Sequence, residues 1–137
     1  MSKIEAPFAN QTVTALNQSQ VGVGKGMIIH PFTCANRGDG NHGNEGGDTG
    51  VLIATEAGWV CPHCDYVQNW AFSAMATERG NSLPNWLQKR QAEAQPTIVR
   101  DRLMDYRSLK YAKPDAPGIG EMLAALQSRA AELDIPA

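Results

Sequence analysis

Three cysteines are the residues of this chain whose type and spacing best suit a metal ion. Cys61 and Cys64 are separated only by Pro62 and His63, so one tight turn can direct both sulfurs at a single point. Cys34 is the remaining cysteine. Thiolate and imidazole ligands suit Zn²⁺, whose structural sites are tetrahedral and therefore need four donors. We expect one structural zinc ion bound by these cysteines and one further donor.

The fourth donor is sought first among the histidines. His63 lies inside the turn, where the geometry that brings the two sulfurs together directs its side chain away. His30 precedes Cys34 by four residues, but Pro31 opposes the helix that would bring the two side chains together. His42 lies in a glycine-rich loop that can fold back on Cys34. We therefore predict His42 as the ligand, with His30 or a carboxylate as the alternatives.

Other kinds of chemistry fit the same residues less well. A redox Cys-x-x-Cys pair is expected in a thioredoxin-like βαβ unit, whereas a short hairpin pattern precedes the motif here. A catalytic zinc would keep one open position, with Glu45 or Glu56 as a base, but no pair of groups stands at a diagnostic spacing. Free cysteines without a metal are the simplest alternative. We expect a structural zinc and no enzymatic activity.

The segments around the candidate ligands have readable patterns. Residues 34–50 are almost all small or polar and predict a loop, while 27–30 predict a short edge strand. Residues 51–55 and 59–61 flank a short connection containing Gly, which predicts a hairpin. A helix is predicted over about 65–78 from one set of apolar residues at helical spacing. That set is Val67, Trp70, Ala71, Ala74 and Met75.

After residue 80 the sequence pattern predicts helices. One helix should end before Pro96, with a second near 97–111 and a third beginning near Ile119, after the linker 113–118. We therefore expect an α+β chain with three parts. These are a poorly structured segment 1–21, a zinc-binding module 22–79 and a helical segment 80–137. Trp59, Trp70, Trp86 and Tyr106 are assigned mainly to the core.

Charge is unevenly distributed along the chain. The net charge is −2 for the whole chain, whereas residues 79–113 hold eight Lys and Arg against three Asp and Glu, which gives 8 − 3 = +5. This basic segment is the part most suited to an acidic partner, although a solvated helix face is the simpler explanation. Its candidate partner-binding residues are Arg79, Lys89, Arg90, Arg100, Arg107 and Lys110.

Two resemblances extend this reading. The order of loop ligands, hairpin, Cys-x-x-Cys and helix over about 30–78 is similar to a treble-clef zinc finger. The segment His30-Pro-Phe-Thr-Cys-Ala-Asn-Arg-Gly-Asp-Gly-Asn-His, followed by Gly58-Trp-Val-Cys-Pro-His-Cys-Asp-Tyr and Asn69-Trp-Ala, resembles small Cys/His proteins of temperate bacteriophages and prophages. The second resemblance covers roughly a third of the chain.

The resemblance to phage proteins implies an accessory protein of the bacterial host cytoplasm. We expect it to bind and inhibit or redirect a host protein complex, such as a defence system. The alternative is a nucleic-acid-binding regulator that uses the basic segment 79–113. The sequence has no apolar run long enough for a membrane span, so we expect no membrane association. We expect the protein to be a monomer or a homodimer.

Overall fold

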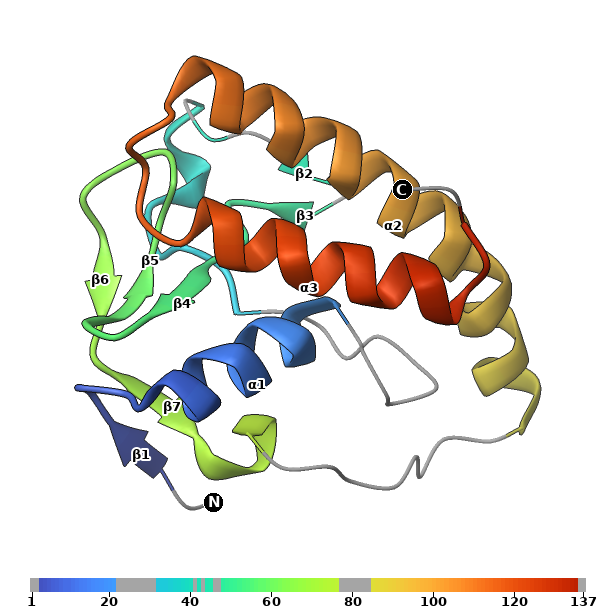
Figure 1. Cartoon of the computed structure of the whole chain (residues 1–137), viewed down its shortest axis with the longest axis horizontal. Coiled ribbons are helices and arrows are strands. Elements are labelled where there is room, and N and C mark those ends of the chain that lie inside the picture. The colour runs from blue at the N-terminus through green and yellow to red at the C-terminus, as the bar shows by residue number, and fades with distance from the viewer. Residues whose placement is uncertain are drawn as a thin grey trace.

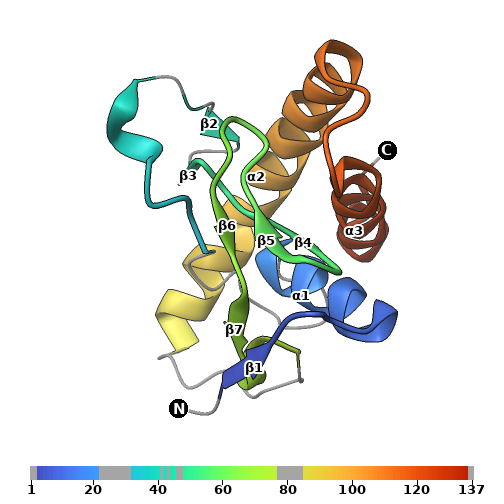
Figure 2. The same cartoon turned by 90° about the vertical axis from the view of Figure 1, so that its left-hand side faces the viewer.

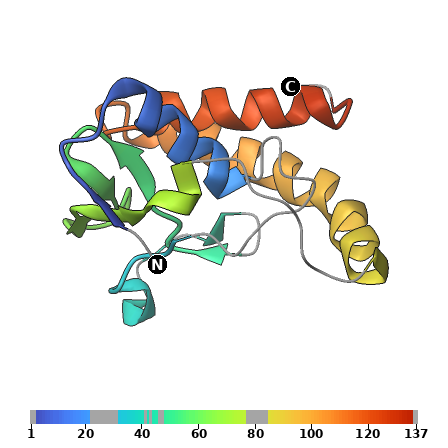
Figure 3. The same ribbon diagram turned by 90° about the horizontal axis from the view of Figure 1, so that it is seen from below.

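The computed structural model places most of the short antiparallel strands at one end of the molecule, from which the longer helices extend (Figure 1, Figure 3). It describes residues 3–21, 32–40, 42, 44–45, 48–76 and 85–135. Within these ranges the helices are α1 (Asn10–Val21), α2 (Asn85–Ala112) and α3 (Ile119–Glu132). The strands are β1 (Lys3–Glu5), β2 (Asn44–Glu45), β3 (Asp48–Thr49), β4 (Ile53–Thr55), β5 (Gly58–Val60), β6 (Val67–Gln68) and β7 (Trp70–Phe72). Two 3₁₀ turns, Arg37–Asp39 and Ser73–Ala76, complete the described elements. The α+β class predicted from the sequence is confirmed.

The strands form separate small sheets. The β4–β5–β6 meander is antiparallel, with Ile53 opposite Val60 and Trp59 opposite Gln68. Strand β7 pairs with β1 from the start of the chain, in the register Ile4–Ala71. Strands β2 and β3 form a third, two-stranded ribbon. The hairpin predicted over 51–61 is therefore present, as β4 and β5 (Figure 2).

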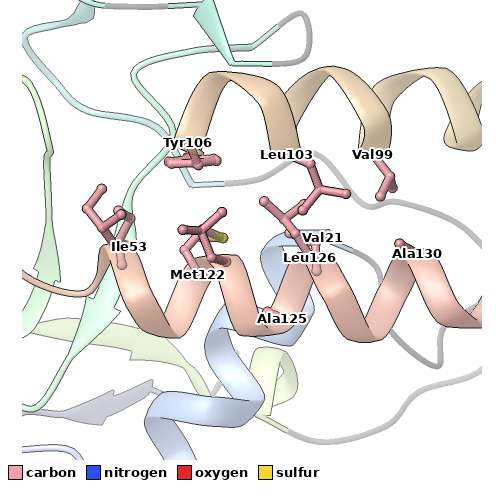
Figure 4. Close-up of a cluster of buried hydrophobic side chains, with 11 residues drawn as sticks. Val21, Ile53, Val99, Leu103, Tyr106, Met122, Ala125, Leu126 and Ala130 are labelled. Carbon is pink, nitrogen blue, oxygen red and sulfur yellow. The ribbon is translucent and has the colours of Figure 1, made fainter. Parts of the chain in front are cut away.

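Strand β4 separates two hydrophobic clusters. Successive side chains of a strand point to opposite faces, so Ile53 packs on one side while Leu52 and Ala54 pack on the other. The cluster on the Ile53 side, called here the helical core, joins α2, α3 and the end of α1 (Figure 4). The cluster on the other side, called here the metal-side core, contains Cys34 and Cys61 together with Phe8, Val13, Leu16, Leu52, Ala54, Trp59 and Ala71.

The helical core follows the apolar periodicity of the sequence. One face of α2 contributes Val99, Leu103 and Tyr106, which meet Met122 and Leu126 of α3 (Figure 4). Tyr106 is fully buried, as expected for a core residue. The last predicted helix is confirmed as α3, and the linker before it lies between Ala112 and Ile119.

Helix α2 continues through Pro96, whereas the sequence predicted a break there. A proline inside a helix lacks the N–H that would bond the carbonyl four residues earlier. Two separate helices were therefore the natural prediction, and it is wrong. Burial of Val99 and Leu103 against α3 directly after the proline provides the packing that holds the helix together.

Residues 3–21 contain β1 and α1, whereas the sequence predicted a poorly structured segment over 1–21. Helix α1 is fixed to β4 by side-chain amides: Asn17 Nδ2 donates to the Ala54 carbonyl at 3.1 Å, and Asn17 Oδ1 accepts from the Ala54 N–H at 2.8 Å. At this edge of β4, Asn17 thus makes the two backbone hydrogen bonds to Ala54 that a neighbouring strand would otherwise make. Local hydrophobicity gives no sign of this contact, because polar residues make it.

The prediction of a helix over 65–78 is wrong for residues 65–76, the part of that range that the structure describes. These residues contain β6, β7 and a 3₁₀ turn. The backbone of this segment finds partners far away in the sequence: β6 pairs with β5 and β7 pairs with β1. The apolar spacing fits a helix, but Ala71 lies in a strand paired with β1 and is buried in the metal-side core. The edge strand expected at 27–30 lies outside the described residues.

Gly118, which precedes α3, gives a first testable prediction. Its φ is +78°, and a Cβ there would meet Ile53 Cγ2 and lie 3.1 Å from Thr55 Cγ2. We expect Gly118→Ala to lower the free energy of unfolding by about 3 kcal/mol, from left-handed strain and overpacking together. Urea unfolding measures the change.

The matched control is Gly120→Ala, two residues later in the first turn of α3, where a Cβ meets nothing within 4 Å. That change should leave the protein as stable or raise its stability by about 0.5–1 kcal/mol, since alanine favours the helix. Equal unfolding midpoints for the two variants would contradict the close packing of the linker on β4.

Candidate metal centre

Four side chains from distant parts of the chain meet beside the metal-side core. One ligand atom from each of Cys34, His42, Cys61 and Cys64 lies within 4.8 Å of the other three. The Cys34 and Cys64 sulfurs are 3.5 Å apart. Cys34 and Cys61 are buried, and His42 and Cys64 are partly buried. A metal ion can therefore be held by these three sulfurs and one imidazole.

Cys61 and Cys64 are placed by the connection between β5 and β6. The Cys61 N–H donates to the Tyr66 carbonyl at 3.1 Å, which closes the hairpin just outside the turn. Within the turn, the His63 N–H donates to Cys61 Sγ at 3.4 Å. The motif therefore lies at the tip of a β-hairpin, with a strand on each side.

Cys34 is placed by a short pairing between two extended segments. Its N–H donates to the Gly50 carbonyl at 2.8 Å, and Leu52 N–H donates to the Phe32 carbonyl at 3.0 Å. These bonds flank an antiparallel bridge between Thr33 and Val51. Cys34 is thereby connected directly to the segment that enters β4.

Gly50 allows the loop to close around the site. Its φ is +70°, and a Cβ there would lie 3.1 Å from Arg37 Cβ, 3.2 Å from His42 Cδ2 and 3.4 Å from Cys34 Cβ. Only a residue without a side chain leaves this space for His42. The sequence analysis did not single out Gly50, because glycines are frequent throughout this loop.

Hydrogen-bond donors are directed at the sulfurs. The Asn36 N–H lies 3.3 Å from Cys34 Sγ, and Asn36 Nδ2 lies 3.8 Å from Cys64 Sγ. Donors of this kind stabilise thiolates and orient metal ligands. Asn36 is a site residue that the sequence analysis missed, although its position two residues after a ligand cysteine was a usable signal.

The environments of the three thiols differ. Burial raises the pKa of Cys34, and it raises the pKa of Cys61 to about 12. Burial also acts to raise the pKa of Cys64, but hydrogen bonds from the Tyr66 N–H, Cys34, His42 and Asn36 outweigh it and lower the pKa to about 7. Three thiols this close cannot all ionise without a cation, because each thiolate disfavours the next.

The donor set fits zinc better than a hard cation. Three sulfurs and one imidazole are soft or borderline ligands, which select Zn²⁺ over Mg²⁺ or Ca²⁺. Their number equals the four positions of a tetrahedral site. The residues present therefore suit a closed, structural metal site.

His63 stays beside the site without joining the group of four. Its ring lies edge-to-face against that of His42, with centroids 5.6 Å apart. His30, the alternative fourth ligand, lies outside the described residues, as does Arg79. The other predicted partner-binding residues, Lys89, Arg90, Arg100, Arg107 and Lys110, are exposed on α2.

The turn that carries Cys61 and Cys64 also contacts the linker between α2 and α3. Lys113 Nζ donates to the Pro62 carbonyl at 3.2 Å. A shallow pocket of about 530 Å³ lies between the two segments. The candidate metal centre is therefore connected to the helical part of the molecule as well as to the sheets.

The fold and site together define an α+β protein with a Cys₃His group able to bind a metal. Comparison with protein-family models, curated proteins and solved structures finds no match. The strands after Cys64 stand where a treble-clef finger would begin its helix. No described helix is both long and apolar enough to cross a bilayer.

Proposed function

We propose that this chain is a binding protein without catalytic activity, whose fold is completed by one structural zinc ion. The observation that carries the proposal is the meeting of Cys34, His42, Cys61 and Cys64, with their ligand atoms within 4.8 Å of one another. All four tetrahedral positions are supplied by the protein. A catalytic zinc instead keeps one position open for water or substrate.

The location of the site supports a structural role. Cys34 and Cys61 belong to the metal-side core, beside the fully buried Trp59. The four ligands come from two segments of the chain, residues 34–42 and the β5–β6 turn. Zinc would cross-link these segments in the same way as a disulfide, and the ion would contribute directly to folding.

The biological setting rests on the sequence resemblance alone. A phage or prophage accessory protein that inhibits or redirects a complex in the host cytoplasm stays a prediction, as does its state as a monomer or homodimer. Affinity capture from bacterial lysate, with and without nuclease, tests the partner: one defined protein complex that survives nuclease would support this setting.

Elemental analysis of the purified protein tests the zinc site. We expect about one zinc per chain after exhaustive dialysis, the stoichiometry of a single closed site. Replacement by Co²⁺ should give the intense visible absorption of tetrahedral cobalt with thiolate ligands. Purified, folded protein that contains no transition metal and takes up none would overturn the proposal.

The two neighbouring histidines provide a sharper prediction. His42→Ala should weaken zinc binding by more than about 100-fold, because even outer-shell partners of a metal ligand are worth about 10–100-fold. His63→Ala is the matched control, since its ring lies against His42 outside the ligand group. Competition with a chromogenic chelator measures both affinities. Equal affinities for the two variants would remove His42 from the ligand set.

A further inference from the structure

The outward face of α2 presents large apolar side chains to solvent. Trp86 is 63% exposed, Met104 is 60% exposed and Tyr111 is 92% exposed. At 3.6 residues per turn these three lie along one line, on the side of α2 opposite the buried Val99 and Tyr106. The sequence analysis assigned Trp86 to the core, and the structure corrects this. Met104 and Tyr111 are seven residues apart and form a small apolar patch near the C-terminal end of α2, whereas Trp86 precedes Met104 by 18 residues and is not contiguous with this patch.

Basic side chains follow one edge of this line. Arg100, Met104, Arg107 and Tyr111 stand at spacings of four, three and four residues and share one face of the helix. Lys110 follows Arg107 by three residues and extends this edge, and Lys89 lies on it nearer the start of the helix; all four basic side chains are exposed. The exposed Glu93 stands four residues after Lys89 and seven before Arg100, so the uninterrupted basic edge runs from Arg100 to Lys110. Neither a hydrogen bond nor an ion pair joins any of them to another residue in the described part of the chain. Their donors are therefore available to a partner.

Two further acidic side chains follow the opposite edge. Asp101 and Asp105 are exposed and lie across the apolar line from Arg100 and Arg107 by helical periodicity. A helix in the major groove of a duplex has a phosphate backbone along each flank, so this edge would face phosphates and repel them. A single strand needs only one basic edge, and its bases can then stack on the exposed aromatic side chains.

We propose that the outer face of α2 binds single-stranded nucleic acid, with phosphates along Arg100, Arg107 and Lys110 and bases on Tyr111. This surface is separate from the zinc site. It rests on the proposed function only because α2 has this exposed face in the folded protein. Arg100 and Tyr111 are separated by 11 residues, or about 16 Å of helix at ~1.5 Å per residue. That is the length of roughly five stacked nucleotides at ~3.4 Å each.

Other basic and aromatic residues of the segment are excluded from this surface by burial. Arg102 is only 1% exposed, and its Nη1 donates to the Gln20 carbonyl at 2.9 Å. Tyr106 lies in the helical core. Both have structural positions, so they cannot contact a nucleic acid without unfolding the interface between α1, α2 and α3.

Fluorescence anisotropy with the zinc-loaded full chain tests the proposal. The probes are a fluorescein-labelled single-stranded oligonucleotide of about 15 nucleotides and the duplex of the same sequence. We expect the single strand to bind more tightly than the duplex, with an affinity that falls steeply as salt rises. In R100Q/R107Q the slope of log K against log salt should become shallower by about 1.4, because two phosphate contacts are lost. In Tyr111→Ala the affinity should fall roughly ten-fold.

The matched control is Arg90→Gln, which removes an exposed cation from the other side of the apolar line. This variant should bind the single strand with nearly the wild-type salt slope. Equal losses in Arg90→Gln and R100Q/R107Q would overturn the proposal, as would preference for the duplex, or no binding at low salt by protein with full zinc content. A protein partner captured through this face, with no oligonucleotide binding, would also overturn it. Zinc content and thermal unfolding of each sample report separately on the proposed function.

Discussion

Cys61→Ala is expected to lose stoichiometric zinc and to unfold the metal-side core. Structural zinc contributes about 10–16 kcal/mol of binding free energy in small zinc domains, which equals or exceeds the whole stability of a typical domain. Cys61 is also buried in the metal-side core with Trp59. Elemental analysis and near-ultraviolet circular dichroism, which reports on packed aromatic side chains, measure the two effects.

The helical core should respond less to this change. Its members come from α2, α3, the end of α1 and Ile53, and none of them is a candidate zinc ligand. We therefore expect Cys61→Ala to keep much of its far-ultraviolet helix signal while the aromatic signal is lost. A fully cooperative loss of both signals would show that the two cores fold as one unit.

Chelation of the wild-type protein separates metal loss from the packing defect. Chelation removes the ion without changing any side chain of the sequence. If the loss of zinc is the main cause of unfolding in Cys61→Ala, the circular dichroism spectrum of the chelated wild type should match that of the variant. The structural-zinc proposal would be falsified if Cys61→Ala retained one zinc per chain and the wild-type unfolding transition.

Gln20→Met is expected to lower the free energy of unfolding by about 3 kcal/mol or more. Gln20 Nε2 donates to the Leu52 carbonyl at 2.9 Å and to the Phe32 carbonyl at 3.0 Å, while Gln20 Oε1 accepts from the Phe32 N–H at 3.0 Å. Methionine keeps the length of the side chain and the helix propensity but makes none of these bonds. The Phe32 carbonyl keeps its bond from the Leu52 N–H, whereas the Phe32 N–H and the Leu52 carbonyl are left without a partner, at a cost of about 1–3 kcal/mol for each such buried group.

Gln11→Met in the same helix is the control, because Gln11 is exposed. Its effect should stay within about 0.5 kcal/mol, as for most surface substitutions. Urea unfolding followed by circular dichroism compares the two variants with the wild type. A Gln20→Met protein as stable as Gln11→Met would mean that solvent, and not Gln20, satisfies the backbone of Phe32 and Leu52.

We expect the loss of the Gln20 hydrogen bonds in Gln20→Met to affect the metal centre as well. Phe32 and Leu52 flank the bridge that places Cys34, and Gln20 is bonded to both. Helix α1 therefore supports a ligand segment although it contributes no ligand itself. This connection was not predictable from the sequence, because a glutamine in a polar N-terminal stretch has no local pattern that marks it as buried.

Several elements were predictable because their cause is local. The Cys61–Cys64 spacing and the hairpin before it depend on a few adjacent residues, and α3 follows from a regular apolar stripe over its own length. Cys34 and His42 could be nominated because few other soft donors exist in the chain. The structure brings these four residues together.

The sequence by itself determined the chemistry available to this protein: three thiols and an imidazole for a soft cation, an α+β class and a basic segment. Tertiary structure alone decided where residues 67–72 pair, because their partners are β5 and the distant β1. It also decided that Arg102 is buried while Arg100 and Arg107 are exposed, since Arg102 Nη1 donates to the Gln20 carbonyl of α1 at 2.9 Å. The physical reason is that both outcomes depend on contacts between segments far apart in the chain, which local propensity does not encode.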